Sequence, residues 1–294
     1  MEQILLSFGH GYSAQALGAL LLSEDWQVIG TTRSKDKAEA LRTTGVTPIL
    51  WPGQDISTYL AKATHLLISA GPNEAGDPVL AVLRDQISAR ASSLKWVGYL
   101  STTGVYGDHQ GAWVDENTPL TPSTRRGEMR VAAEAAWQTL ASETGLPLHI
   151  FRLAGIYGPG RGPFAKVRAG TARRIIKPGQ VFSRIHVADI AQVLAASIAR
   201  PNPGAIYNVC DDDPAPPETV IAHAAELLGL PLPPAVDYAT AEMTPMARSF
   251  YAESKRVRND KIKTELGVRL KFPAYNEGLA ALLAEEQQKT SADK

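Results

Sequence analysis

The sequence predicts an α/β protein built on a doubly wound parallel sheet, followed by a smaller C-terminal subdomain. Short apolar runs alternate with helix-like segments at the spacing of β-α-β units. The runs are apolar at consecutive positions, as expected for strands that are buried on both faces of a parallel sheet. A glycine-rich turn separates the first apolar run from the first helix-like segment, as is typical of the start of such a fold.

The first half of the chain contains six predicted strands and five predicted helices. The strands cover residues 4–6, 27–31, 46–50, 65–69, 96–100 and 148–153, and the helices cover residues 15–22, 35–42, 55–62, 78–91 and 127–143. Gly145 and Pro147 follow the last of these helices and end it. Ligands of such sheets bind outside the carboxyl ends of the strands, so we expect the site there.

The second half of the chain is less regular. Residues 157–180 are rich in Gly, Pro and Arg and are predicted to form loops. The remaining predicted elements are a helix at 186–199, a strand at 205–209, and helices at 218–228, 259–266 and 276–287.

The overall charge argues against polyanionic partners. The 294 residues include 30 basic and 30 acidic side chains, so the formal net charge is zero and neither nucleic acid nor an anionic membrane is an expected partner. Cys210 is the single cysteine and cannot form an internal disulfide, which favours a cytoplasmic location. No signal peptide or apolar run of about 18 residues is apparent, so no membrane span is expected.

The stretch Ser7-Phe8-Gly9-His10-Gly11-Tyr12-Ser13-Ala14 predicts a Rossmann-type dinucleotide site. Gly9, Gly11 and Ala14 fit the fingerprint G-x-G-x-x-G/A between a strand and a helix. Gly11 lacks a Cβ, so a pyrophosphate can approach the backbone, and the following helix N-terminus favours negative charge. The expected cofactor contacts in this loop are Gly9, His10, Gly11, Tyr12, Ser13 and Ala14. A merely structural turn is the alternative.

The end of the second predicted strand favours NADP(H) over NAD(H). A NAD site usually has an acidic residue there for the ribose 2′-hydroxyl. This chain has Thr32 and Arg33 instead, and no acid before Asp36. Arg33 can pair with a 2′-phosphate, with a hydroxyl contact from Thr32. The alternative is that Arg33 is a solvated surface charge.

From residue 96 onward the chain resembles the extended short-chain dehydrogenases/reductases, the group of NAD-dependent nucleotide-sugar epimerases and dehydratases. The motifs that carry the resemblance are LSTTGVYGD, FRLAGIYGPGRG, FSRIHVADIA, YNVCDDDP and SKRVRNDKIKTELGVRLKFP, in the family's order. The glycine loop departs from the family's G-x-x-G-x-x-G and looks like the atypical, YeeZ-like branch. The resemblance implies a cofactor domain at 1–156 and 185–210 and a substrate-binding subdomain at 157–184 and 211–294.

The resemblance breaks at the catalytic residues. Family members use a Ser or Thr after the fifth strand and a Tyr-x-x-x-Lys on the next helix. Thr102 matches the hydroxyl position, but Arg126 and Arg130 stand where Tyr and Lys should be. Arg does not release a proton near neutral pH, so Arg126 cannot replace the tyrosine, whereas Arg130 can still hydrogen-bond the ribose. Dehydratases add an Asp-Glu pair after the Thr, and this chain has Thr103 and Gly104.

The resemblance and the strand ends together predict further ligand contacts. Four residues at or after strand ends are expected at the cofactor: Ser69, Ala70, Ser101 and Tyr157. Three arginines in or near the Arg-rich segment after residue 153 are expected at an anionic substrate such as a nucleotide sugar: Arg161, Arg174 and Arg184. A solvated surface position is the alternative for each. No metal site is predicted.

Two functions are compatible with these residues. The first is an NAD(P)-dependent oxidoreductase or epimerase with an altered active site and a small-molecule substrate. The second is a catalytically inactive NADP(H)-binding sensor or regulator. The resemblance also leaves a homodimer open, through the helices at 78–91 and 127–143, which are those that pair in family dimers.

Overall fold

The computed structural model describes residues 2–292, and it confirms the predicted α/β fold. Seven parallel strands form the central sheet in the order β11-β7-β5-β4-β1-β2-β3. These strands are β1 (Ile4–Phe8), β2 (Gln27–Thr32), β3 (Thr47–Leu50), β4 (His65–Ile68), β5 (Trp96–Thr102), β7 (Leu148–Leu153) and β11 (Ile206–Val209). Strands β2 and β3 are added on one side of β1, and β4, β5, β7 and β11 on the other, so the strand order reverses between β1 and β4. Doubly wound sheets bind ligands at this point.

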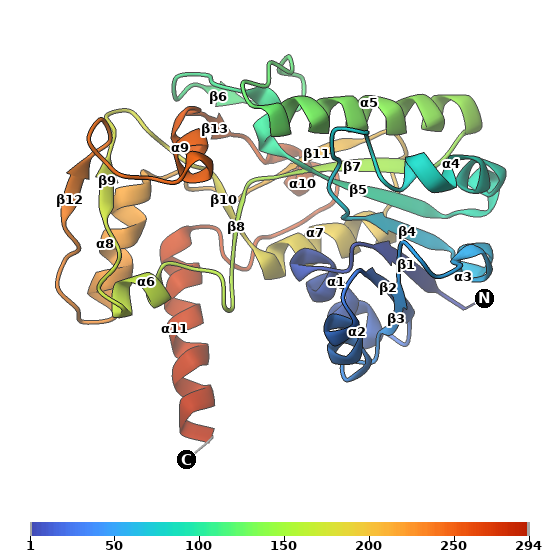
Figure 1. Ribbon diagram of the computed structural model, residues 1–294, viewed down its shortest axis with the longest axis horizontal. Coiled ribbons are helices and arrows are strands. Elements are labelled where there is room, and N and C mark those ends of the chain that lie inside the picture. The colour runs from blue at the N-terminus through green and yellow to red at the C-terminus, as the bar shows by residue number, and fades with distance from the viewer. Residues whose placement is uncertain (1, 293–294) are drawn as a thin grey trace.

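Helices cover both faces of the sheet (Figure 1). One face carries α1 (Tyr12–Leu22), α2 (Lys35–Arg42) and α7 (Val187–Ala199), and the other carries α3 (Ser57–Lys62), α4 (Leu80–Ala89) and α5 (Arg125–Thr144). Consecutive strand residues point to opposite faces, so Leu5 enters the core beneath α1, whereas Leu6 enters the core beneath α4 and α5. This two-sided burial explains the continuous apolar runs of the sequence.

A smaller subdomain lies beside the sheet, at the left of Figure 1. Its elements are α6 (Phe164–Arg168), β9 (Arg174–Ile176), α8 (Pro217–Leu227), β12 (Ala235–Asp237), α9 (Pro245–Tyr251) and α11 (Tyr275–Ala292). β9 pairs with β12, and α6, α8 and α11 share an apolar core of their own. The paired strands β8 (Gly155–Tyr157) and β10 (Arg184–His186) connect this subdomain to the sheet.

The structure differs from the sequence-based expectation in the second half of the chain. The segment 157–180, predicted to be irregular, contains α6 and β9, and α9 was not predicted at all. The segment 256–268 contains β13 (Arg256–Val257) and α10 (Asp260–Thr264), and β13 pairs with β6 (Trp113–Val114). Ile262 and Val268 of this segment are buried in the core beneath α1 and α7, so it packs on the large sheet and not within the smaller subdomain.

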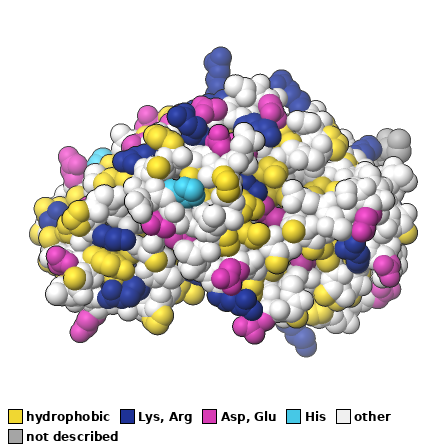
Figure 2. All heavy atoms as spheres, turned by 90° about the horizontal axis from the view of Figure 1, so that it is seen from above, with side chains coloured by type: hydrophobic (Ala, Val, Ile, Leu, Met, Phe, Trp, Pro, Cys, Tyr) yellow, Lys and Arg dark blue, Asp and Glu magenta, His cyan; other side chains and the backbone are white. Residues whose placement is uncertain are grey.

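Two surface properties bear on partners. Basic and acidic side chains are intermixed on the face shown in Figure 2. Among residues 2–292, no helix combines the length and apolar character that crossing a membrane requires.

Candidate functional site

Gly9 is required by the geometry of the loop itself. It follows β1 with a φ of 75°, and its N–H donates to Thr31 Oγ1 at 2.8 Å. A Cβ at this position would lie 2.9 Å from the backbone nitrogen of Ala70, whose N–H donates to Phe8 O. Any larger residue would therefore be strained and would push β4 away from the turn.

Gly11, by contrast, is not required by any protein contact. Its backbone is extended, it precedes the first residue of α1, and a Cβ would meet only Gly9 O, at 3.8 Å. The first turn of α1 contains no acidic residue and has no side-chain cap, so its leading N–H groups face this open space. A side chain at Gly11 would fill the space that a pyrophosphate needs, so the loop fits a dinucleotide.

The side chain of His10 lies in the core, so the predicted cofactor contact of this residue could come only from its backbone. A Cβ added to Gly30 would lie 2.6 Å from the His10 ring, and one added to Gly18 would lie 3.0 Å from it, so the ring is held between β2 and α1. Neither ring nitrogen has a hydrogen-bond partner, and burial lowers the pKa of His10 to about 4. The sequence contains a signal for this packing: Gly18 and Gly30 lie inside apolar elements, where a glycine indicates the close approach of a bulky group.

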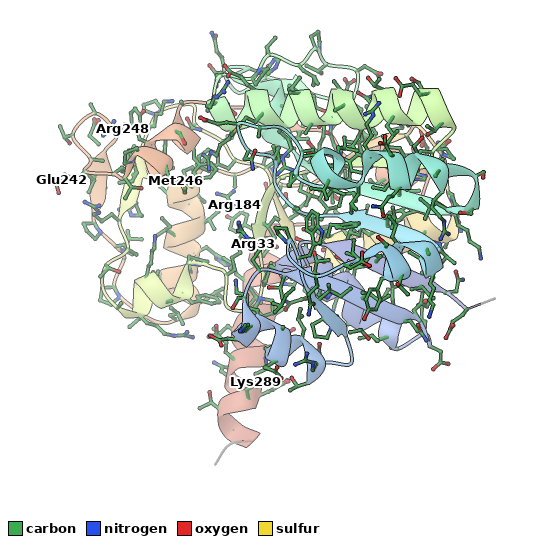
Figure 3. The ribbon with its side chains drawn as sticks, turned by 45° about the vertical axis from the view of Figure 1, so that its right-hand side comes forward. Arg33, Arg184, Glu242, Met246, Arg248 and Lys289 are labelled. Atoms are coloured by element: carbon green, nitrogen blue, oxygen red, sulfur yellow. The ribbon has the colours of Figure 1, made fainter. Side chains whose placement is uncertain are left out.

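Arg33 is an exposed residue directly after β2. No ion pair or side-chain hydrogen bond involves it among residues 2–292. The neighbouring hydroxyls shape the turn: Thr32 Oγ1 accepts from Ser34 N at 3.3 Å, and Ser34 caps α2 by accepting from Lys37 N at 3.4 Å. In Figure 3, Arg33 lies on the side of the sheet that faces the smaller subdomain. Its guanidinium is therefore free to bind an anion at this strand end.

A cleft of about 920 Å³ lies between the sheet and the smaller subdomain. It brings together ten of the predicted site residues: Tyr12, Ser13, Ser69, Ser101, Thr102, Arg126, Arg130, Tyr157, Arg161 and Arg184. The loop residues Gly9, Gly11 and Ala14, the β2 end at Thr32 and Arg33, and Ala70 lie outside the lining of this cleft. The cleft therefore contains the predicted catalytic residues and most of the predicted substrate residues.

Thr102 and Ser101 have different environments at the end of β5. Thr102 Oγ1 accepts from Gly104 N at 3.1 Å, which caps the short helix η2 (Thr103–Tyr106) and leaves its proton free to be donated into the cleft. Ser101 donates instead to the buried carboxylate of Glu134, which pairs with Arg152 at 2.8 Å. The hydroxyl of Ser101 is therefore engaged in the core, and this does not fit its assignment as a cofactor contact.

Arg130 lies between the carboxyl ends of β4 and β5. Its Nη1 donates to Leu100 O at 2.8 Å and to the Tyr99 hydroxyl at 3.2 Å. Its Nη2 is 3.5 Å from the position that a Cβ would take on Gly71, just after β4. Burial raises the pKa of Tyr99, and Arg130 opposes this effect. Tyr99 is thus neutral at physiological pH, and its hydroxyl and the Leu100 carbonyl hold the Arg130 guanidinium at the edge of the cleft.

Arg126 connects the two sides of the cleft. It lies in the first turn of α5, which Thr124 caps by accepting from Gly127 N at 3.1 Å. Its Nη2 donates to Ser249 Oγ at 3.0 Å, and its guanidinium lies 5.0 Å from the centre of the Phe250 ring. Arg126 therefore holds α9 against the mouth of the cleft.

Arg184 and Arg174 are placed differently. Arg184 Nη1 donates to Phe182 O at 2.9 Å and to Ala215 O at 3.0 Å, so its guanidinium is anchored in the cleft wall by backbone carbonyls. Arg174 lies outside the cleft, where its Nε donates to Pro233 O at 2.8 Å. The pairing of β9 with β12 turns Arg174 toward this outer segment, so the structure does not support its predicted substrate contact.

Tyr157 does not present its hydroxyl to the cleft. The hydroxyl is buried without a hydrogen-bond partner, and a Cβ on Gly278 of α11 would lie 2.1 Å from it. Burial, with Asp211 and Asp189 nearby, raises the pKa of Tyr157. The hydroxyl packs toward α11 and the ring against His186, so only the rest of Tyr157 is available for the predicted cofactor contact.

Sequence reasoning missed the part of the cleft that follows β12. Ser249, Phe250 and Tyr251 from α9 line it, together with the ion pair of Lys255 and Glu253. Lys255 Nζ donates to Gly107 O at 2.7 Å and to Glu253 at 2.6 Å. The α9 helix spans only seven residues, and Met246 and Phe250 on it are exposed, so no apolar periodicity marked it.

Comparisons with known proteins agree with this architecture. A conserved protein of unknown function from Silicibacter pomeroyi DSS is 66% identical with a TM-score of 0.93, over 96% of this chain and 99% of that one. The dTDP-glucose 4,6-dehydratase of Bacillus anthracis, solved in complex with NAD, has a TM-score of 0.79 at 16% identity over 98% and 97% of the two chains, a likeness of fold.

Two sequence comparisons identify the family. Protein YeeZ of Escherichia coli K12 is 31% identical over 238 residues, which are 76% of this chain and 84% of YeeZ. The sequence model of the NAD dependent epimerase/dehydratase family matches residues 79–210, from the start of α4 through β11. The glycine loop, the cleft at the strand ends and these matches together show that the chain is an epimerase-like member of the NAD dependent epimerase/dehydratase family.

Proposed function

We propose that this protein is an NADP(H)-dependent oxidoreductase whose substrate is a small anionic molecule, with a nucleotide sugar as one candidate. One observation supports the anionic substrate. Four arginines line a single cleft, and none of them forms an ion pair within residues 2–292: Arg126, Arg130, Arg161 and Arg184. The protein as a whole is neutral, so this concentration of unpaired charge favours a phosphate or carboxylate ligand.

The residues of the cleft suit a reaction that lacks a side-chain acid at the tyrosine position. The dinucleotide, when bound, supplies or accepts a hydride. Thr102 can donate a hydrogen bond to a substrate oxygen, because its hydroxyl accepts from Gly104 N and its own proton has no acceptor within residues 2–292. Arg130 can bind a ribose hydroxyl, and its permanent charge stabilises negative charge that develops on the substrate. Hydride transfer then depends mainly on positioning.

The preference for NADP(H) depends on Arg33. The end of β2 has no carboxylate for a ribose 2′-hydroxyl, and Arg33 is exposed and unpaired at that point. The N-terminus of α2 follows directly but has Asp36 in its first turn, so Arg33 is the group that would bind a 2′-phosphate.

Titration of NADPH and NADH against the wild type and Arg33→Ala tests the cofactor. We expect NADPH to bind at least about tenfold more tightly, and Arg33→Ala to remove most of this difference. Equal affinity for both cofactors in the wild type would overturn the preference.

A panel of nucleotide sugars and phosphorylated metabolites tests the substrate. We expect anions to raise the unfolding temperature of the wild type and to have less effect on Arg184→Ala. Arg174→Ala is the matched control, because Arg174 is anchored outside the cleft. The absence of any stabilisation by anions would contradict the proposal.

A second candidate is a cofactor-loaded sensor without turnover. Arg126 favours it, since the residue at the tyrosine position is bound to Ser249 and Phe250 and not free in the cleft. Oxidation of NADPH with any member of the substrate panel would identify an enzyme. Tight NADPH binding with no oxidation, even in Arg126→Tyr combined with Arg130→Lys, would identify the sensor.

A further inference from the structure

A tight turn at residues 158–161 carries Arg161 from the smaller subdomain to the start of α1. The turn is closed by two backbone hydrogen bonds of 2.9 Å, from Gly158 N to Arg161 O and from Arg161 N to Gly158 O. Its position is set by backbone geometry, so the side chain of Arg161 projects from a fixed base.

The turn packs directly on Tyr12, the first residue of α1. The Tyr12 hydroxyl donates to Pro159 O at 3.0 Å, and the Arg161 guanidinium lies 5.7 Å from the centre of the Tyr12 ring. A Cβ on Gly158 would be 2.5 Å from the Tyr12 hydroxyl, so this approach is as close as glycine allows. The two subdomains therefore meet at the N-terminus of α1 through Tyr12 and Arg161.

This position is unfavourable for a cation unless an anion accompanies it. The N-terminus of a helix carries partial positive charge and destabilises a nearby Arg. The first turn of α1 has no acidic residue, and Arg161 forms no ion pair among the described residues. Two positive groups thus face the same space with no negative charge from the protein.

A second observation at the same place indicates a ligand. Ser13, the second residue of α1, is 6% exposed, lines the cleft and has no side-chain hydrogen bond within residues 2–292. The open space above Gly11 lies one residue before Tyr12. The unpartnered hydroxyl of this largely buried residue, the free helix N–H groups and a guanidinium together form a site for a group with several acceptor oxygens.

We propose that Arg161 binds the pyrophosphate of the dinucleotide from the opposite subdomain, and not the substrate. This inference rests on the proposed binding of NADP(H). It reassigns a residue that the sequence placed on the substrate side, and it leaves Arg126, Arg130 and Arg184 as the cleft arginines that support an anionic substrate. It also implies that the bound anion bridges Arg161 and the helix end, across the contact that the turn 158–161 already makes with Tyr12.

Calorimetric titration with NADPH, ADP-ribose and 2′-AMP tests the assignment without measuring activity. ADP-ribose contains the pyrophosphate and lacks the 2′-phosphate, whereas 2′-AMP has the reverse composition. We expect Arg161→Ala to weaken ADP-ribose and NADPH about tenfold and to leave 2′-AMP unchanged. Arg33→Ala should weaken 2′-AMP and leave ADP-ribose unchanged.

Arg168→Ala is the matched control. Arg168 is exposed, lies in the same segment and pairs with Glu286, so its loss should change none of the three affinities. The exposed position of Arg161 predicts an unchanged unfolding temperature, and Arg161→Lys should retain part of the ADP-ribose affinity.

The outcomes separate this inference from the proposed function. If the wild type binds NADPH and ADP-ribose, and Arg161→Ala binds both equally well, the assignment of Arg161 is overturned while the cofactor proposal stands. If the wild type binds neither NADPH nor NADH, the proposed function itself is overturned.

Discussion

The two ends of the proposed site are built in different ways. The cofactor end lies outside the lining of the cleft and is formed mainly by backbone: the turn at Gly9, the open position at Gly11 and the first N–H groups of α1. The substrate end lies in the cleft and is formed by side chains, above all Arg126 and Arg130 on α5 and Thr102 at the end of β5. A site made of backbone depends on the sequence only where a side chain would strain or fill it, as at Gly9 and Gly11, whereas a site made of side chains changes its chemistry with each substitution.

The wall behind the substrate end is nevertheless held rigidly. Glu134 on α5 accepts from Ser101 and pairs with Arg152 of β7, and both charged side chains are at most 3% exposed. Arg152 donates to the Tyr106 hydroxyl at 2.9 Å, which donates to Asn208 at 2.7 Å. This network fixes β5, β7, β11 and α5 relative to one another, so Thr102 and Arg130 are carried on a stable frame.

Removing Glu134 should have the largest effect on stability, and it should displace the Thr102 and Arg130 side chains that the buried network supports. Glu134→Ala leaves Arg152 buried without its counter-charge, and we expect a loss of about 3–5 kcal/mol in the free energy of unfolding. Glu143 lies on the same helix as Glu134 and forms an exposed pair with Arg84 of α4, so Glu143→Ala should cost less than about 1 kcal/mol. Urea denaturation measures both, and equal losses would contradict a rigid buried frame.

The two glycines of the loop should separate folding from binding. Gly11→Val fills the open space, so we expect cofactor affinity to fall about 100-fold, or about 2.7 kcal/mol, with little change in stability. Gly9→Val combines a φ of 75° with a contact of 2.9 Å to Ala70 N, so we expect a stability loss of about 1–3 kcal/mol. NADPH titration and thermal unfolding distinguish the two. Full cofactor affinity in Gly11→Val would place the dinucleotide elsewhere.

Asp211 gives a pH test of the charge at the substrate end. Burial raises its pKa from the ordinary 3.8 to about 8, with Arg184 opposing the shift. Between about pH 4 and 8 the unfolded chain has lost a proton that the folded chain keeps. Unfolding therefore releases a proton, and the free energy of unfolding falls as pH rises, by at most about 1.4 kcal/mol per pH unit.

Asp211→Asn should remove this part of the pH dependence, as denaturation at pH 6, 7 and 8 would show. The same variant should also alter how the binding of an anion near Arg184 depends on pH. A neutral Asp211 leaves Arg184 uncompensated at pH 7, so an anionic ligand should bind the wild type less tightly at pH 9, while Asp211→Asn changes less. Identical profiles for the two proteins would mean that Asp211 is ionised throughout.

Arg126 offers the smallest effect and tests the contact between the two sides of the cleft. Arg126→Ala removes one hydrogen bond and one cation–π contact to α9, so we expect a change of about 1 kcal/mol, confined to that helix. Amide exchange in residues 245–251 should become faster while the sheet is unaffected. Arg125→Ala is the control, because the neighbouring Arg125 pairs with Glu128 on its own helix. Equal exchange in both variants would mean that α9 is held by other contacts.

Most of the large sheet was predictable because its strands are buried on both faces. The runs at β1, β4, β5 and β7 had to be continuous and apolar, and the spacing between them allowed only helices as connections. The smaller subdomain was less predictable. β9 and β12 have three residues each and α9 has seven, so none is long enough to show a period.

The sequence by itself determined the features that depend on local backbone: Gly9 and Gly11 in the turn, Arg33 after β2, and Arg126 and Arg130 on the helix that follows the loop after β5. Only the tertiary structure decided which side chains face the cleft. His10, Ser101 and Tyr157 have suitable chemistry and adjacent positions, yet their polar side-chain atoms are buried or bonded in the protein interior. The physical reason is that side-chain direction depends on packing between elements distant in sequence, whereas the conformation of a turn depends on its own residues.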